Sequence, residues 1–208
     1  MATTTPNYGW PVPTSTDYVK DGATAIEALG DAIDATVFGL GSGFNLIRTA
    51  AFSGATSHSY GSDASPIFTS AYRNYKIVID NLSAVSEQVI NFRLRANTTD
   101  FTGANHDTQS FYALSTTIGS GRASNQTSAA IGVASQATQT SSIVLDLTLP
   151  QLANVKNIQS FNMYYANAEG PRLNMYYSSI NSASAYNGCT IFAGANISGQ
   201  ISIYGYDI

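Results

Sequence analysis

The distribution of apolar positions divides the chain into a short helical segment and a long β-rich remainder. Between residues 16 and 41, apolar side chains recur every three or four positions, which places them on one stripe of a helix. The stripe consists of Val19, Ala23, Ile26, Ile33, Val37 and Leu40. From Asn45 onward apolar and polar residues alternate instead, as in strands that bury one face. The pattern predicts an amphipathic helix over 16–41 and a β domain over 45–208.

The predicted helix requires a partner, because a single helix of this length with interior glycines is marginally stable in water. Its apolar stripe has the spacing of a short coiled-coil seam, while alanines and acidic residues occupy the other faces. Val and Ile on the seam suit a three-stranded bundle, so we predict a homotrimer. The alternative is a helix that covers one face of the chain's own β domain.

Alternating runs in the β region predict nine or ten short strands separated by Gly, Asn and Ser. In the strand Tyr75–Asp80 the residues Tyr75, Ile77 and Ile79 share one face, and in Ser142–Leu149 the inward residues are Ile143, Leu145 and Leu147. Further strands are predicted at Leu46–Phe52, Ile90–Arg95, Gln109–Thr117, Ala129–Val133, Ile158–Ala166, Leu173–Ile180, Gly188–Ala193 and Gln200–Tyr206. Since no helical pattern intervenes, this indicates a mainly β fold, an antiparallel β-sandwich of jelly-roll type. The stretch Gly119–Gln139 has few bulky residues and predicts a long exposed loop or an edge hairpin.

Residues 1–15 form a segment rich in proline and aromatic side chains ahead of the helix. Proline favours an extended path, and large aromatic rings in such a path are costly to expose to water. We therefore expect this segment to fit a groove on another protein or subunit, and the alternative is a disordered tail. The expected anchoring residues are Tyr8, Trp10, Pro11 and Pro13. Residues Thr14–Asp17 read as the cap that starts the helix.

Composition narrows the classes of function. Only 11% of the 208 residues are charged and the net charge is −4, which disfavours binding to nucleic acid, because that binding depends on neutralising phosphates. The single cysteine, Cys189, rules out an intrachain disulfide framework. No apolar run approaches the length of a bilayer span, and the first residues lack the features of a secretory signal. These features lead us to expect synthesis and retention in a soluble compartment.

The sequence offers no arrangement of residues suited to catalysis. Its two histidines, His58 and His106, are expected in loops, and no spacing rule supports a metal site built from His106 with Asp100 and Asp107. The acidic residues of the β region do not form an evident pair for cleaving polysaccharides. We therefore predict that the protein is not an enzyme and binds no cofactor or metal.

The abundance of tyrosine points to binding instead. Thirteen tyrosines stand among many Ser and Asn residues, a mixture that makes adaptable contact surfaces and can stack on sugar rings. More than half of these tyrosines are expected to be structural, within strands. The residues predicted to contact a ligand, from loops, are Tyr112, Arg122, Tyr186 and Asn187.

Two segments resemble a known class of proteins. The opening Pro6-Asn7-Tyr8-Gly9-Trp10-Pro11, followed by Thr16 to Ile26, resembles the N-terminal anchoring motif of tailed-bacteriophage virion proteins of the minor tail and short tail-fibre type. The stretch Tyr72–Val78 and the closing Gly199–Tyr206 resemble, more loosely, the β-sandwich tips that such proteins carry.

This resemblance implies a virion structural protein, made in the cytoplasm of the host bacterium. The first 40 residues would attach it to other virion proteins, and the sandwich, as a homotrimer, would bind a host surface polysaccharide during attachment. The chain lacks an extended shaft, so it would be a short tail fibre or tail-tip appendage. The alternative is a capsid decoration protein, head fibre or tail adaptor with a purely structural role.

Overall fold

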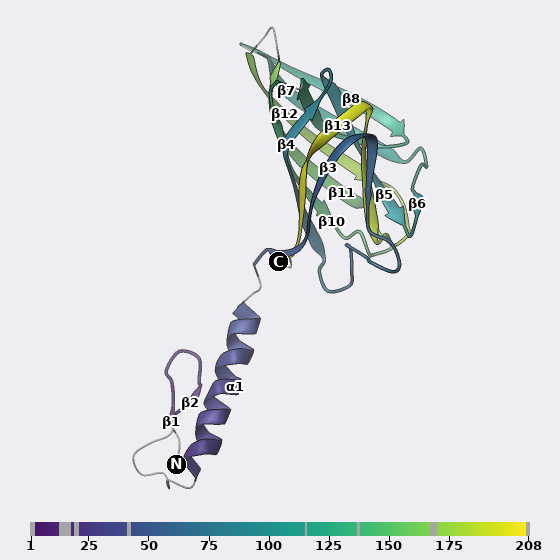
Figure 1. Ribbon diagram of the computed structural model, residues 1–208. Helices are drawn as coiled ribbons and strands as arrows, with labels where there is room; N and C mark the ends of the chain where they lie inside the picture. Colours follow the sequence, from purple (N-terminus) through teal and green to yellow (C-terminus); the bar gives the residue numbers. More distant parts are fainter. Residues whose placement is uncertain are drawn as a thin grey trace. The chain divides into compact units, whose positions relative to one another are not determined.

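The computed structural model describes residues 3–12, 18, 21–40, 43–114, 116–136, 138–166 and 170–206. The chain divides into two compact units, an N-terminal unit of residues 1–43 and a β unit of residues 44–208 (Figure 1). Each unit is described by itself. The predicted residues Pro13 and Val19, the proposed cap Thr14–Asp17 and the side chain of Leu40 lie outside what the structure describes.

The N-terminal unit contains a small hairpin and a helix. Strands β1 (Thr3–Thr4) and β2 (Pro11–Val12) pair antiparallel. The amide of Thr5 donates to the carbonyl of Trp10 at 2.9 Å, and Gly9 closes the turn at a positive φ of 67° that glycine adopts without strain. The segment expected to be extended is therefore a folded hairpin. Helix α1 (Gly22–Leu40) follows, within the range predicted for it.

The β unit is mainly β, as the alternation predicts. Its strands are β3 (Asn45–Tyr60), β4 (Asn74–Ala84), β5 (Gln88–Ala96), β6 (Thr99–Asp100), β7 (His106–Leu114), β8 (Thr117–Gln126), β9 (Ala129–Gln136), β10 (Ser141–Thr148), β11 (Lys156–Ala166), β12 (Gly170–Ile180) and β13 (Gly188–Tyr206). All pairings among them are antiparallel except a short parallel contact of β4 with β9.

Strand β13 joins two layers of the β unit. Its first part, up to Phe192, pairs with β5, and its second part, from Ile197, pairs with β4. Strand β3 follows β13 along both parts, and both strands bend at register shifts between Phe192 and Ile197. One layer continues from β4 through β10, β11, β12 and β7 to β8, and the other continues from β5 to β9. Figure 1 shows β3 and β13 running side by side over their length.

The core lies between these layers and fits the predicted alternation. Tyr75, Ile77 and Ile79 are buried on β4, and Ile143, Leu145 and Leu147 are buried on the neighbouring β10. From the second layer, β5 contributes Ile90, Phe92 and Leu94, and β9 contributes Ile131. Burying such side chains stabilises the fold by roughly 1.5–3 kcal/mol each.

Three local predictions need correction. The two strands expected at 188–193 and 200–206 form the single strand β13, because a bend rather than a turn separates them. The stretch Gly119–Gln139 is an edge hairpin only in part: β8 pairs with β7, but β9 pairs with β5 and is largely buried. His58 and His106 lie in strands β3 and β7, not in loops.

Candidate interaction surfaces

One face of helix α1 is covered by the hairpin of the same chain. The indole Nε1 of Trp10 donates a hydrogen bond to Oγ1 of Thr36 at 2.8 Å, and that hydroxyl donates to the carbonyl of Ala32 at 2.8 Å. Leu29, one turn earlier, is partly buried on the same face. Trp10, which we expected to fit a groove on another protein, instead packs on its own helix. Within one chain the indole of Trp10 is thus occupied by an intramolecular contact, and its anchoring role stays a prediction.

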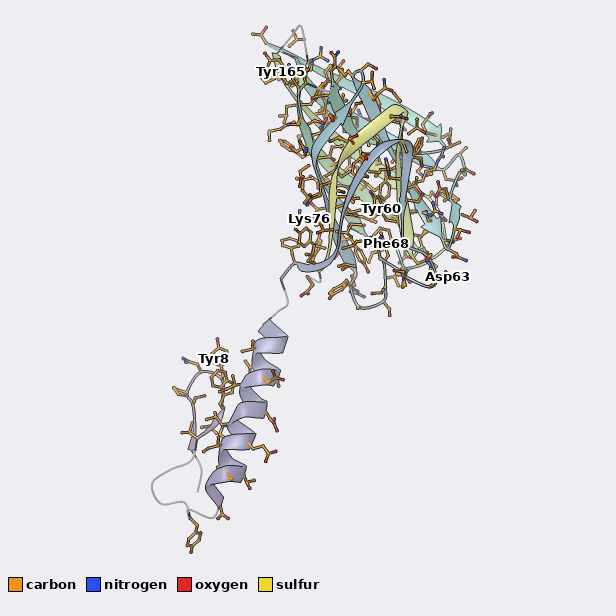
Figure 2. All side chains as sticks on the ribbon, in the orientation of Figure 1. Tyr8, Tyr60, Asp63, Phe68, Lys76 and Tyr165 are labelled. Atoms are coloured by element: carbon orange, nitrogen blue, oxygen red, sulfur yellow. The ribbon has the colours of Figure 1, made fainter. Side chains whose placement is uncertain are left out.

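Tyr8 remains available on the surface of the N-terminal unit. Its ring stacks on Trp10 with centroids 5.2 Å apart, and 58% of the residue is exposed (Figure 2). Pro11 is partly buried in β2. Of the expected anchoring residues, Tyr8 is thus the one that the described hairpin presents to solvent.

The predicted seam of α1 is largely uncovered. Ile26 is 65% exposed and Val37 is 59% exposed, Ala23 is exposed with them, and Ile33 is partly buried. At 100° per residue this stripe lies beside the face that the hairpin covers. Glu27, Asp31 and Asp34 flank its other side, exposed to solvent. The helix therefore carries an apolar stripe that its own hairpin does not bury.

A second apolar surface lies on the outward side of strands β11, β12, β7 and β8. We call it the outer apolar face and define it by Phe111, Ile118, Phe161, Met163, Tyr165, Met175 and Tyr177, whose exposed fractions range from 38% to 83%. The strand register places these side chains in rows: Phe161 stands opposite Met175, and Met175 opposite Phe111. In the next row Met163 stands opposite Leu173. Tyr165, labelled in Figure 2, extends the face along β11.

The inward side of the same strands is polar. On β11, Ser160 and Asn162 are buried, and both bind the backbone of β9: Ser160 Oγ donates to the carbonyl of Ile131 at 2.8 Å. The amide of Val133 donates to Oδ1 of Asn162 at 2.9 Å, and Nδ2 of Asn162 donates to the carbonyl of Ser142 at 2.9 Å. These bonds offset the cost of burying polar groups. Over this part of β11 the usual alternation is thus reversed, with polar side chains inside and apolar side chains outside. The spacing of apolar residues alone does not tell which side faces the core.

Two shallow hollows open along the outer apolar face. One, of about 190 Å³, is lined by Phe111, Tyr112, Ala113, Ile118, Leu173 and Met175. The other, of about 520 Å³, is lined by Met163, Tyr165 and Leu173 together with polar residues such as Thr140, Ser142 and Arg172. Arg172 donates to the hydroxyl of Tyr164 at 2.9 Å and lies 3.6 Å from the carboxylate of Glu87.

The four residues predicted to bind a ligand do not form one site. Tyr186 is buried in the core, and its hydroxyl bonds that of Ser182 at 2.6 Å, so its role as a loop contact is a wrong prediction. The side-chain Oδ1 of Asn187 accepts a hydrogen bond from the backbone amide of Asn97 at 2.9 Å, which connects two loops. Tyr112 stands opposite Gly119, whereas Arg122 stands opposite Gln109, which places them on opposite sides of the β7–β8 hairpin.

Several titratable groups of the β unit take part in structural contacts or are buried. Asp100 lies 3.0 Å from Arg95 and accepts the hydroxyl of Thr190 at 2.7 Å. His106 is fully buried, and burial lowers the pKa of its imidazole, whose Nδ1 lies 3.0 Å from the carbonyl of Gln126. Burial likewise raises the pKa of the Cys189 thiol well above its ordinary value. Among the described residues, no three His, Cys, Asp or Glu side chains gather as a metal site would require.

Comparison with family models, curated proteins and solved structures finds no match to this chain. No helix within the described residues has the length and apolarity needed to cross a membrane.

Proposed function

We propose that this chain is a homotrimeric structural protein of a tailed-phage virion, a short tail fibre or tail-tip appendage. The N-terminal unit would assemble three copies and attach them to the particle through the exposed Tyr8. The β unit, of antiparallel sandwich type with a jelly-roll arrangement, would contact a host surface glycan.

The observation that carries this proposal is the uncovered stripe on α1. Ala23, Ile26 and Val37 stay exposed while the chain's own hairpin packs beside them, so the described part of the N-terminal unit does not cover the stripe. Small and β-branched side chains at this spacing fit the interior of a short bundle of identical helices. The acidic flank would remain in solvent around such a bundle.

The decisive experiment measures the molar mass of the full chain by sedimentation. The unaltered protein is expected at three times the chain mass of 22.0 kDa. Replacing Ile26 and Ile33 together by Asp would bury charges in the bundle and reduce the mass to that of one chain. The matched control is Ala28→Asp with Ala35→Asp, on an exposed face away from the stripe, which is expected to leave the trimer intact. A single-chain mass for the unaltered protein would refute the proposal.

The glycan contact has its own test. Labelled protein is applied to an array of bacterial surface polysaccharides, and binding to at least one of them is expected. Binding to none, together with failure to adhere to any bacterium that the parent phage infects, would remove receptor binding from the proposal.

A second candidate function is a decoration or adaptor protein that braces the particle. It is favoured by the fate of the predicted ligand residues, since Tyr186 is buried, Asn187 ties loops together, and Tyr112 and Arg122 face apart. Reconstruction of the assembled particle separates the two. A distal β unit favours attachment to the host, and a β unit wedged between neighbouring subunits favours bracing.

A further inference from the structure

The outer apolar face is unusually large for a surface left in water. Taking roughly 200 Å² for each large side chain, the exposed fractions of its seven residues amount to roughly 700 Å². The largest apolar patch of a typical monomer covers about 300–600 Å², and a stable interface buries about 800 Å² on each partner. A face of this size therefore suits a protein partner of ordinary interface size.

The composition of the face indicates what that partner is. None of its seven residues is charged. The exposed Arg122 stands on the same side, opposite Gln109 in the row of Tyr177, so the row of Phe161, Met175 and Phe111 is the part that a second copy can meet without burying like charges. The charged residue Arg172, at the edge of the hollow, already lies 3.6 Å from Glu87 of the same chain. A saccharide site needs several polar groups converging on one aromatic platform. The centre of this face instead presents Phe161, Met175 and Phe111 in one row.

The buried polar residues on the inward side of β11 support the same choice of partner, a second copy of the chain. Ser160 and Asn162 hold β11 to the rest of the unit through bonds to backbone groups, so the inward side of this strand is fixed. Phe161, Met163 and Tyr165 are thereby held outward, and they cannot turn inward unless the strand slips by one residue. The outward orientation is thus a stable property of the fold.

The face also reaches an open edge of the sheet. Among the described strands β8 pairs with β7 alone, and its Ile118 is 83% exposed. A sister β unit can therefore pack across β8, β7, β12 and β11 in the repeated, non-identical contacts that a threefold axis generates.

We infer that the outer apolar face is the interface between the β units of sister copies. This inference rests on the proposed trimer and adds to it a second contact, separate from the helix. The helix brings the three β units together, and the face then excludes water between them.

The native methionines provide a direct test, since Met163 is 55% exposed and Met175 is 43% exposed in the single chain. The purified full chain is treated with hydrogen peroxide, and oxidation of each methionine is followed by peptide mass spectrometry, with the protein in denaturant as reference. In the native trimer both residues are expected to oxidise at least tenfold more slowly than in denaturant. In the variant Phe111→Ser with Ile118→Ser, which changes exposed side chains only, both rates should rise toward the reference. The control Val85→Ser with Val89→Ser, exposed positions outside the face, should keep the protection.

The outcomes separate this inference from the proposed function. A trimer whose Met163 and Met175 oxidise within twofold of the denatured rate would overturn the interface and leave the helix-based trimer standing. A single-chain protein with reactive methionines would overturn both. Slow oxidation that persists in the dissociated Ile26→Asp, Ile33→Asp variant at single-chain mass would also overturn the inference, because sister copies would not be its cause.

Discussion

Gly188 lies where the start of β13 passes closest to the end of β3. A Cβ atom at this position would stand 2.3 Å from the carbonyl oxygen of Tyr60, so only glycine lets the two backbones meet. Gly61 lies across the same contact, at a positive φ of 86°. Gly188 therefore serves a close approach of two strands.

This close contact predicts that adding one methyl group at Gly188 destabilises the β unit. Gly188→Ala is expected to lower the free energy of unfolding of the β unit by about 2 kcal/mol, because the backbone of Tyr60 must shift to admit the methyl group. Urea unfolding measures this change. It is followed by far-UV circular dichroism rather than by tryptophan fluorescence, because Trp10, the single tryptophan, lies in the other unit.

Gly30→Ala is the matched control for this substitution. Gly30 is in α1 with nothing within 4 Å of its added Cβ, so alanine should strengthen the helix by up to about 1 kcal/mol and leave the β unit unchanged. An unaltered midpoint for Gly188→Ala would contradict the close approach.

At the scale of elements, strand β11 shows why part of the architecture follows from sequence and part does not. Strands such as β4 and β10 put Ile and Leu on one side only, so alternation identified both the strands and their inward residues. In β11 both sides carry large side chains, Ile158 and Tyr164 on one and Phe161 and Met163 on the other. Hydrophobicity alone does not decide between them. The deciding factor is the hydrogen bonding of Ser160 and Asn162 to β9, a contact between distant parts of the chain.

The helix gives a similar lesson about the candidate sites. The spacing predicts the apolar stripe, on which Ile26 and Val37 are exposed, and its role as an oligomer seam stays a prediction. The sequence pattern does not predict the adjoining face with Leu29 and Thr36. That face contacts the indole of Trp10, which belongs to a hairpin that the pattern does not predict either. The residues predicted to bind a ligand depended on loop positions, and strand formation removed that basis for Tyr112 and Arg122.

Asn162 predicts how much the polar layer contributes to the stability of the β unit. Replacing it by Leu leaves the amide of Val133 and the carbonyl of Ser142 without this partner inside the protein, so the free energy of unfolding should fall by about 2 to 3 kcal/mol. Chemical denaturation measures the change. The equivalent substitution at the exposed Asn196 of β13 should change stability by less than about 0.5 kcal/mol. An equal loss of stability for the Asn162 and Asn196 substitutions would show that the hydrogen bonds of Asn162 to β9 do not contribute specifically to stability.

At the scale of the whole molecule, buried phenols and the thiol make stability depend on alkaline pH. Burial is the main cause that raises the pKa of Tyr176 to about 12 and that of Tyr206 to about 12; nearby Asp146 adds to the effect at Tyr206. Burial also raises the pKa of Tyr60 and Cys189 above their ordinary values. Because the unfolded chain releases these protons first, their stabilising contribution is complete below the ordinary pKa values of 9.0 and 10.0 and is lost as pH rises further.

The free energy of unfolding is therefore expected to fall from about pH 9 upward, by at most about 1.4 kcal/mol per pH unit for each group. Denaturation curves between pH 8 and pH 11 measure this slope. Tyr206→Phe should make the fall less steep above pH 10. A flat profile up to pH 11 would contradict the burial of these groups.

The shared strand β13 also bears on how the polypeptide is made. It pairs with β3, β4 and β5, yet it is translated roughly 140 residues after β3 begins. At about 5–20 residues per second, the earlier strands wait on the ribosome for several seconds to half a minute before their partner emerges. During that interval β3 and β4 present unpaired edges to other nascent chains. Efficient production of this protein would therefore depend on chaperone capacity and on slow, dilute synthesis.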